Sequence, residues 1–206
     1  MPVTPLQAAT DVLDRADALL ALDAPPTLED VRTDLRRLAW AMASASIDTF
    51  LHWRVARADL YAPQLRQELR ELTVPFGELV AMARADVIAR QENRVNRPVV
   101  KARNVLHERI LRDTFQNKRG VERALSMCGV ADIWRRISAA MGETVGEVTD
   151  HVNALANRRN AIVHEGDIQR QSRPQQVRHQ PISEAEIRAE LDWARRFVNA
   201  LALVAP

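Results

Sequence analysis

Residues 157–167, with the sequence NRRNAIVHEGD, place cationic and titratable side chains close together just ahead of a Gly-Asp break. Arginine carries a permanent positive charge and histidine as a residue type can change its charge near neutral pH, so Arg159 and His164 together suit the binding of an anion and the transfer of a proton. Cations near a helix C-terminus also interact favourably with the helix dipole. A solvated helix end therefore explains the same residues without any chemistry, and the rest of the chain has to decide between the two explanations.

A single helix is expected to carry this run. Thr144 and Glu147 have the spacing of a capping box, which predicts that a helix begins there and ends at the Gly-Asp break. Asparagine is a mediocre helix former, so three asparagines on one side of this helix argue for a site rather than for a merely soluble surface. The polar stripe spans about 60° of arc on an ideal helix and consists of Asn153, Asn157, Asn160 and His164.

Arg159 lies on a different side of the same helix. On an ideal helix it points about 140° away from His164, near the side that faces the core. One straight helix would therefore not direct both side chains at one ligand. We expect either that the helix opens near Asn160 or that a second chain contributes to the site.

The composition of the chain predicts an all-α fold. Only 6 of the 206 residues are glycine, and apolar residues recur at three- and four-residue spacing. The 29 basic residues are nearly balanced by 27 acidic ones, so any contact with nucleic acid must be local. The single cysteine, Cys128, excludes an intramolecular disulfide, fits a reducing compartment and is expected to pack in the core. Acidic residues interrupt the first apolar run, so we expect a cytoplasmic protein without a signal peptide or membrane span.

The expected architecture is an antiparallel helical bundle in one domain, residues 1–206. Residues 1–26, a helix followed by a Pro-Pro hinge, are expected to form an appendage to a core of residues 27–206. Capping signals at Thr27 with Asp30 and at Ser183 with Glu186 mark the starts of two long helices. Helices are expected at residues 5–22, 27–60, 64–71, 75–91, 98–113, 119–127 and 131–141, followed by one helix from Thr144 and one from Ser183.

The arginine-to-histidine spacing in residues 159–164, RNAIVH, resembles the R-x4–6-H motif of HEPN domains in its R-N-x3-H form. The chain is similar to the RiboL-PSP-like branch of that family in particular. Further pieces of the likeness are the stretches GVERALSMCGVADIWRRI, VNALANRRN, HEGD and SIDTFL, and together they cover roughly residues 35–203.

The resemblance implies a helical bundle that dimerises so that two R-x4-H motifs line one cleft, and in many members a metal-independent endoribonuclease. The chemistry of the residues agrees, because RNA supplies its own nucleophile in the 2′-hydroxyl. Cleavage then needs a group that moves protons near neutral pH and a cation that stabilises the crowded phosphate. His164 and Arg159 suit these catalytic roles, and Asn160 can orient the phosphate or the imidazole. A dimer cleft would also remove the angular difficulty between Arg159 and His164.

Three residues are expected to support the catalytic group. Asp48, in SIDTFL, occupies the acidic position of the family's early helix, where it either orients Arg159 or His164 or makes a helix-packing hydrogen bond. Arg158 and Asn157 flank the catalytic residues in the sequence and are expected to assist them.

Other basic residues are candidates for RNA contacts. Arg103 and His107 would share a helix face at i,i+4, but only three residues separate them, which departs from the family spacing; they either contact a phosphate or form a solvated pair. Residues 93–123 hold nine Lys and Arg against three acidic residues, which fits RNA binding and ordinary solvation equally well. The loop of residues 168–180 contains no acid, and its Arg170 and Arg173 are expected to contact RNA.

Other classes of chemistry lack their motifs. The sequence has no G-x-x-x-x-G-K-[ST] phosphate loop, no G-x-G-x-x-G and no H-E-x-x-H, and its five histidines are scattered singly, so we expect neither a metal nor a cofactor. The four tryptophans lie among apolar neighbours and are expected in the core or an interface.

The resemblance thus implies a homodimeric ribonuclease that acts on RNA as a toxin, stress or phage-defence effector, as many family members do. The alternative is a non-catalytic HEPN module that binds RNA, a nucleotide or a partner protein. A third possibility is a toxin restrained by a cognate antitoxin or nucleotidyltransferase partner.

Overall fold

The computed structural model describes residues 2–22, 28–69, 76–92, 98–169 and 176–205, and these residues form helices joined by short connections. Within these ranges the β-pairing is limited to an isolated bridge between Ile168 and His179. The predicted all-α class is confirmed. The helices are α1 (Pro5–Leu20), α2 (Glu29–Val55), α3 (Pro63–Leu69), α4 (Phe76–Gln91), α5 (Pro98–Ile110), α6 (Lys118–Met127), α7 (Ile133–Met141), α8 (Val145–Glu165) and α9 (Glu184–Val204).

Helices α1, α2 and α9 form the centre of the fold and pack against one another. The apolar stripe of α1 is fully buried at Ala9, Leu13 and Ala16, and it belongs to the same hydrophobic core as Phe50 of α2 and Phe197 of α9. The expectation that residues 1–26 form an appendage is therefore wrong for α1. An amphipathic helix gains stability by covering its apolar stripe, and here α2 and α9 provide the cover.

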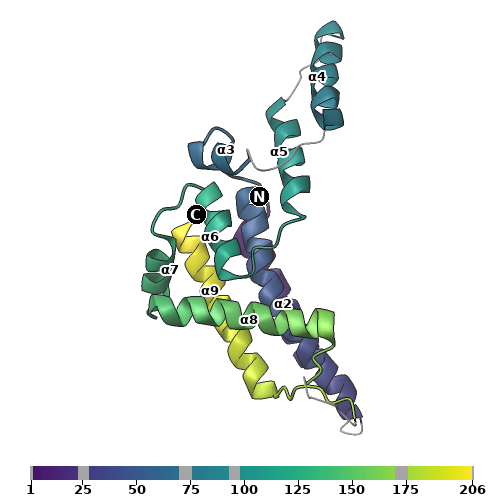
Figure 1. The fold of residues 1–206 in the computed structure, drawn as a ribbon, viewed down its shortest axis with the longest axis vertical. Helices are drawn as coiled ribbons and strands as arrows, with labels where there is room; N and C mark the ends of the chain where they lie inside the picture. Colours follow the sequence, from purple (N-terminus) through teal and green to yellow (C-terminus); the bar gives the residue numbers. More distant parts are fainter. Residues whose placement is uncertain (1, 23–27, 70–75, 93–97, 170–175, 206) are drawn as a thin grey trace.

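Helices α2 and α9 run in the same direction (Figure 1). Near their starts, Arg36 Nη1 donates to the Ile182 carbonyl at 3.3 Å, and near their ends Arg54 Nε donates to the Ala205 carbonyl at 3.0 Å. The expected antiparallel arrangement holds for α1 against α2 but not for α2 against α9. The reason is that the chain after α8 returns to the N-terminal half of α2 before α9 begins.

The predicted capping boxes of the last two long helices are confirmed. Thr144 and Glu147 bond each other's backbone at the start of α8, and Ser183 and Glu186 do so at the start of α9. Helix α2 begins at Glu29 after Leu28, which makes no side-chain capping bond, and the predicted cap residue Thr27 lies outside the described residues.

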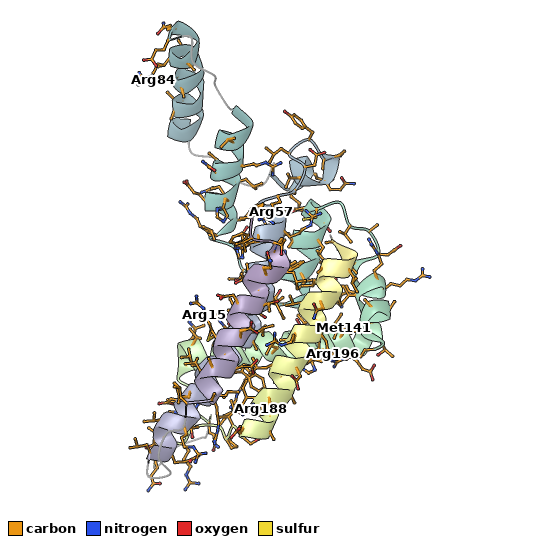
Figure 2. The ribbon with its side chains drawn as sticks, turned by 180° about the vertical axis from the view of Figure 1, so that it is seen from behind. Arg15, Arg57, Arg84, Met141, Arg188 and Arg196 are labelled. Atoms are coloured by element: carbon orange, nitrogen blue, oxygen red, sulfur yellow. The ribbon has the colours of Figure 1, made fainter. Side chains whose placement is uncertain are left out.

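Helix α4 contacts α5 and projects from the rest of the molecule (Figure 1). Figure 2 labels Arg84 on this projecting helix. The element that stands apart is thus α4, which lies in the middle of the chain, and α1 at its start is part of the core.

Helix α8 crosses both α2 and α9 (Figure 1). The indole Nε1 of Trp40 donates to the Leu155 carbonyl at 3.3 Å, and the His151 ring stacks on Trp193 with centroids 3.9 Å apart. These two contacts fix the crossing, so the last turns of α8 and the residues they carry occupy a defined place beside α2. Trp40 and Trp193 act here as packing residues, as expected, whereas Trp53 is exposed.

The expectation for Cys128 is also confirmed, because the residue is half-buried and packs against the core. Burial raises the pKa of its thiol to about 11, against the lowering effect of Arg54 nearby. A thiol that ionises so reluctantly is a packing group and not a reactive one.

Candidate functional site

The site that the sequence predicts lies on the last turns of α8, which stays helical through Glu165. Gly166 ends the helix with a φ of 62°, a left-handed conformation that favours glycine, and its N–H bonds the Ala161 carbonyl. The helix therefore does not open near Asn160, and that expectation is wrong. His164 stands exposed in the last turn, and Asn160 is exposed one turn earlier.

Arg159 and His164 nevertheless come together within one chain. The Nη1 atom of Arg159 lies 3.4 Å from Nε2 of His164 and donates to Oδ1 of Asn160 at 3.1 Å. The long arginine stem starts half-buried near the core side and carries the guanidinium around the helix to the polar face. The prediction that one straight helix keeps the two groups apart is wrong, because it considered the direction of Cβ and not the reach of the side chain.

This contact has a chemical consequence for His164. A guanidinium can only donate, so a hydrogen bond between the two groups requires an unprotonated Nε2 with the ring proton on Nδ1. That form of imidazole accepts a proton from a hydroxyl group. At 3.4 Å the contact is long and weak, so an anion that draws the guanidinium toward itself would release Nε2 for this task.

An open pocket of about 560 Å³ adjoins this group. Asn157 and Asn160 of α8 contribute one wall, which places both predicted residues at the pocket. The other wall comes from the residues after the helix, which the sequence did not single out. The lining residues are Asn157, Asn160, Ala161, Glu165, Ile168, Gln169 and Gln180.

Asp48 makes the helix-packing hydrogen bond that was one of its two expected roles. Its Oδ1 accepts from the backbone N–H of Phe115 at 2.6 Å and lies 3.5 Å from Nδ1 of His52. Burial raises the pKa of this carboxyl above its ordinary value, and the Phe115 bond, His52 and Arg159 act in the opposite direction. Asp48 thus anchors the loop before α6, and its carboxylate interacts favourably with the charge of Arg159.

Arg158 points away from Arg159 and holds the chain that follows α8. Its Nη2 lies 2.8 Å from Oδ2 of Asp167, and Nε of Arg37 in α2 lies 3.0 Å from the same oxygen. The Asp167 side chain is fully buried, whereas the two arginines reach solvent at 18% and 11% exposure. Arg158 therefore does not assist catalysis at the phosphate, and its support for the site is mechanical.

Replacing Asp167 with alanine is expected to lower the free energy of unfolding by about 2–4 kcal/mol. The change leaves Arg37 and Arg158 close together without their shared carboxylate, and solvent at both arginines keeps the loss below that of a fully buried pair. Chemical denaturation measures the loss. The matched control is Glu184→Ala, which removes an exposed pair with Arg188 and is expected to leave the stability nearly unchanged. Equal stabilities of the two variants would contradict the role assigned to Asp167.

Arg103 does not face a ligand. Its Nη1 donates to the carbonyls of Ala56 and Ala58, at 3.0 and 3.1 Å, where α2 ends. The last carbonyls of a helix lack intrahelical partners, so a cation there is a capping group. The prediction that Arg103 binds RNA is thus wrong, whereas His107 is exposed on α5 and its RNA contact stays a prediction. Arg170 and Arg173 lie outside the described residues.

One residue of the polar stripe on α8 and one basic residue of the segment 93–123 make contacts that hold the fold together. Asn153, the first residue of the polar stripe, accepts a hydrogen bond from the backbone N–H of Lys118 at 3.1 Å and so fixes the start of α6. Arg123 pairs with Glu68 at 3.3 Å and with Asp113 at 3.1 Å. Both residues act within the fold, so only the last two turns of α8 keep the polar stripe available for a ligand.

The opposite face of the molecule carries arginines that are already paired. Figure 2 labels Arg15, Arg188 and Arg196 there. Each of these forms an ion pair with a nearby carboxylate, at 2.9, 2.7 and 2.9 Å respectively. Paired charges attract a polyanion weakly, so the α8 end is the better candidate for a phosphate site.

Comparisons with known proteins leave the family open: no family model, no curated protein and no solved structure matches the chain. Among the described residues, no helix is long and apolar enough to cross a membrane, and no three His, Cys, Asp or Glu side chains are grouped as metal ligands. The function has to be argued from the geometry at the end of α8.

Proposed function

We propose that this protein is a metal-independent endoribonuclease of the HEPN type, with Arg159, Asn160 and His164 as its catalytic group. One observation carries the proposal: a guanidinium, a carboxamide and an imidazole meet at the exposed end of one helix, on the rim of an open pocket. A solvated helix end explains the charges but not a contact between Arg159 and His164 across about 140° of helix.

The roles follow from the geometry. His164 Nε2 takes the proton from the 2′-hydroxyl, and the resulting oxygen attacks the adjacent phosphorus. Arg159 donates to the non-bridging oxygens as negative charge builds there, and Asn160 holds the guanidinium in place. The bond to the 5′-oxygen breaks, this oxygen takes up a proton from water, and the products are a 2′,3′-cyclic phosphate and a 5′-hydroxyl.

The alternative is a non-catalytic module that binds RNA, a nucleotide or a partner protein. The pocket alone would suffice for that role, because it is large enough for a nucleotide. The Arg159–His164 contact favours the enzyme, since a binding module needs no group that can accept a proton beside its cation. As an enzyme the protein would act as a cytoplasmic toxin, stress or phage-defence effector. Restraint of such a toxin by an antitoxin or nucleotidyltransferase partner is a third possibility.

A homodimer is part of the proposal. Beside the site, Val163 and Ile168 expose 50% and 43% of their surface, which suits contact with a second copy. A composite site was expected because Arg159 and His164 seemed too far apart in one chain. Their contact within one chain removes that reason, so each protomer is proposed to carry its own complete catalytic pair.

Mixing inactive Arg159→Ala chains with inactive His164→Ala chains is therefore expected to restore less than about 1% of wild-type cleavage, because each chain still lacks one member of its own pair. Cleavage of a labelled RNA after subunit exchange measures this, and mass spectrometry confirms that mixed dimers have formed. A matched mixture of wild-type and His164→Ala chains should keep activity in proportion to the wild-type chains. Recovery in the doubly mutant mixture would show that the site is shared between chains.

The product ends test the proposed reaction. Cleavage in EDTA is expected to give a 2′,3′-cyclic phosphate, because the neighbouring 2′-oxygen is the nucleophile. An RNA with 2′-O-methyl at the scissile nucleotide should be cleaved at least about 100-fold more slowly, since this oxygen can then neither lose a proton nor attack. Equal cleavage of the methylated RNA, or products with a 5′-phosphate, would contradict the mechanism.

A further inference from the structure

The pocket beside the catalytic group has an unusual lining, because four of its seven lining residues carry a carboxamide. A carboxamide combines a hydrogen-bond donor and an acceptor in one plane. The remaining lining residues are the carboxylate of Glu165 and the apolar Ala161 and Ile168. The four carboxamides belong to Asn157, Asn160, Gln169 and Gln180.

The wall opposite α8 is a built feature of the fold. The backbone N–H of Gln169 donates to the Arg178 carbonyl at 2.7 Å, and that of Gln180 donates to the Asp167 carbonyl at 2.8 Å. These bonds join the two chain segments around the bridge between Ile168 and His179. Asp167 in turn is held by two arginines, so the two glutamines are fixed relative to the end of α8.

The side chains of these glutamines are also oriented. Gln180 Oε1 accepts a hydrogen bond from Arg158, and Gln169 Nε2 donates to the His179 carbonyl at 3.1 Å. Each amide group is thereby held in one of its two flipped orientations. The wall presents a set pattern of donor and acceptor atoms, as selective recognition of a polar edge requires.

We propose that this pocket is a nucleobase subsite, which holds the base of a nucleotide next to the scissile phosphate. Carboxamides match base edges, where a donor and an acceptor also lie side by side. Unpaired bases of single-stranded RNA are recognised through such edges. Asn160 belongs both to the pocket and to the Arg159 contact, so a base in the pocket leaves its phosphate within reach of the guanidinium.

The carboxylate in the lining makes the subsite selective. An ionised Glu165 can only accept hydrogen bonds, so it favours bases that present an exocyclic amino group, namely adenine, cytosine and guanine. Uracil lacks this group, and the one donor on its edge, N3–H, lies between two carbonyl oxygens that a carboxylate repels. The inference rests on the proposed ribonuclease function and adds to it a preference against uracil at one nucleotide beside the cleaved bond.

The test uses single-stranded RNAs that differ in one base, on either side of a single cleavable phosphate. Wild-type protein is expected to cleave the RNA with its preferred amino-bearing base about tenfold or more faster than the RNA with uracil, when the base is varied on one side of the cleavable phosphate. Glu165→Gln should reduce this ratio to about threefold or less, because glutamine also donates and can pair with the uracil carbonyl. Asp150→Asn, at an exposed acid on the same helix, is the matched control and should leave the ratio unchanged.

Binding of the four 3′-nucleoside monophosphates to the His164→Ala variant, measured by calorimetry, separates the two proposals. Weaker binding of 3′-UMP, with the difference lost when Glu165→Gln is added, supports the subsite even if no RNA is cleaved. Cleavage with equal rates at all four bases, unchanged in Glu165→Gln, overturns the subsite and leaves the ribonuclease in place. If the protein shows no RNA cleavage and no nucleotide binding, both the ribonuclease and the subsite are overturned.

Discussion

Replacement of His164 by alanine is expected to lower the rate of RNA cleavage by about 10²–10⁴, the usual contribution of a general acid or base. The imidazole is exposed at the end of α8, so its removal leaves the core untouched. The loss should therefore appear in the rate of cleavage and not in stability. Single-turnover cleavage of a labelled RNA, together with a thermal melt of each protein, measures both quantities.

The matched control for this variant is His107→Ala, an exposed histidine on α5. It is expected to cleave within about threefold of wild type, because a surface contact with RNA affects binding more than the chemical step. If the His164→Ala variant were fully active and the His107→Ala variant were inactive, the catalytic site would lie on α5 and not on α8.

Replacement of Arg159 by alanine is expected to reduce cleavage by about 10²–10³, the loss typical for one donor to a developing oxyanion. Arg159→Lys should recover only part of the activity, because a lysine offers a point charge and not the planar fork that bonds Asn160 and a phosphate together. Single-turnover rates of the two variants at saturating RNA measure the difference.

Arg135→Ala is the control for Arg159, since Arg135 is an exposed arginine on α7. This change removes the same charge from another part of the surface and should leave the cleavage rate within about threefold of wild type. A loss in Arg159→Ala that is matched by Arg135→Ala would show that total charge matters and that the position of the guanidinium does not.

Sequence signals predicted helix starts well where the stabilising interactions lie within one turn of the helix. The capping boxes at Thr144 and Ser183 each need residues within one turn, and both are present in the structure. The parallel course of α2 and α9 was not predictable in this way. It depends on contacts between distant residues, such as Arg36 with Ile182, that no single segment encodes.

The candidate site was predicted in its residue types more than in its geometry. The helical wheel placed Arg159 and His164 on different sides of α8, but the long Arg159 side chain reaches around the helix and contacts His164. Arg103 matched an i,i+4 pattern with His107, but the free carbonyls at the end of α2 compete for its guanidinium. The pocket wall at Gln169 and Gln180 comes from a returning loop, whose place depends on the burial of Asp167 by two arginines.

The central claim is that the group on α8 cleaves RNA without a metal. The most direct measurement is incubation of purified wild-type protein and of its His164→Ala variant with total RNA in excess EDTA, with the fragments resolved on a gel. We expect cleavage by the wild type that EDTA does not diminish, and intact RNA with the variant. Intact RNA with both proteins, or equal cleavage by both, would exclude metal-independent cleavage by His164.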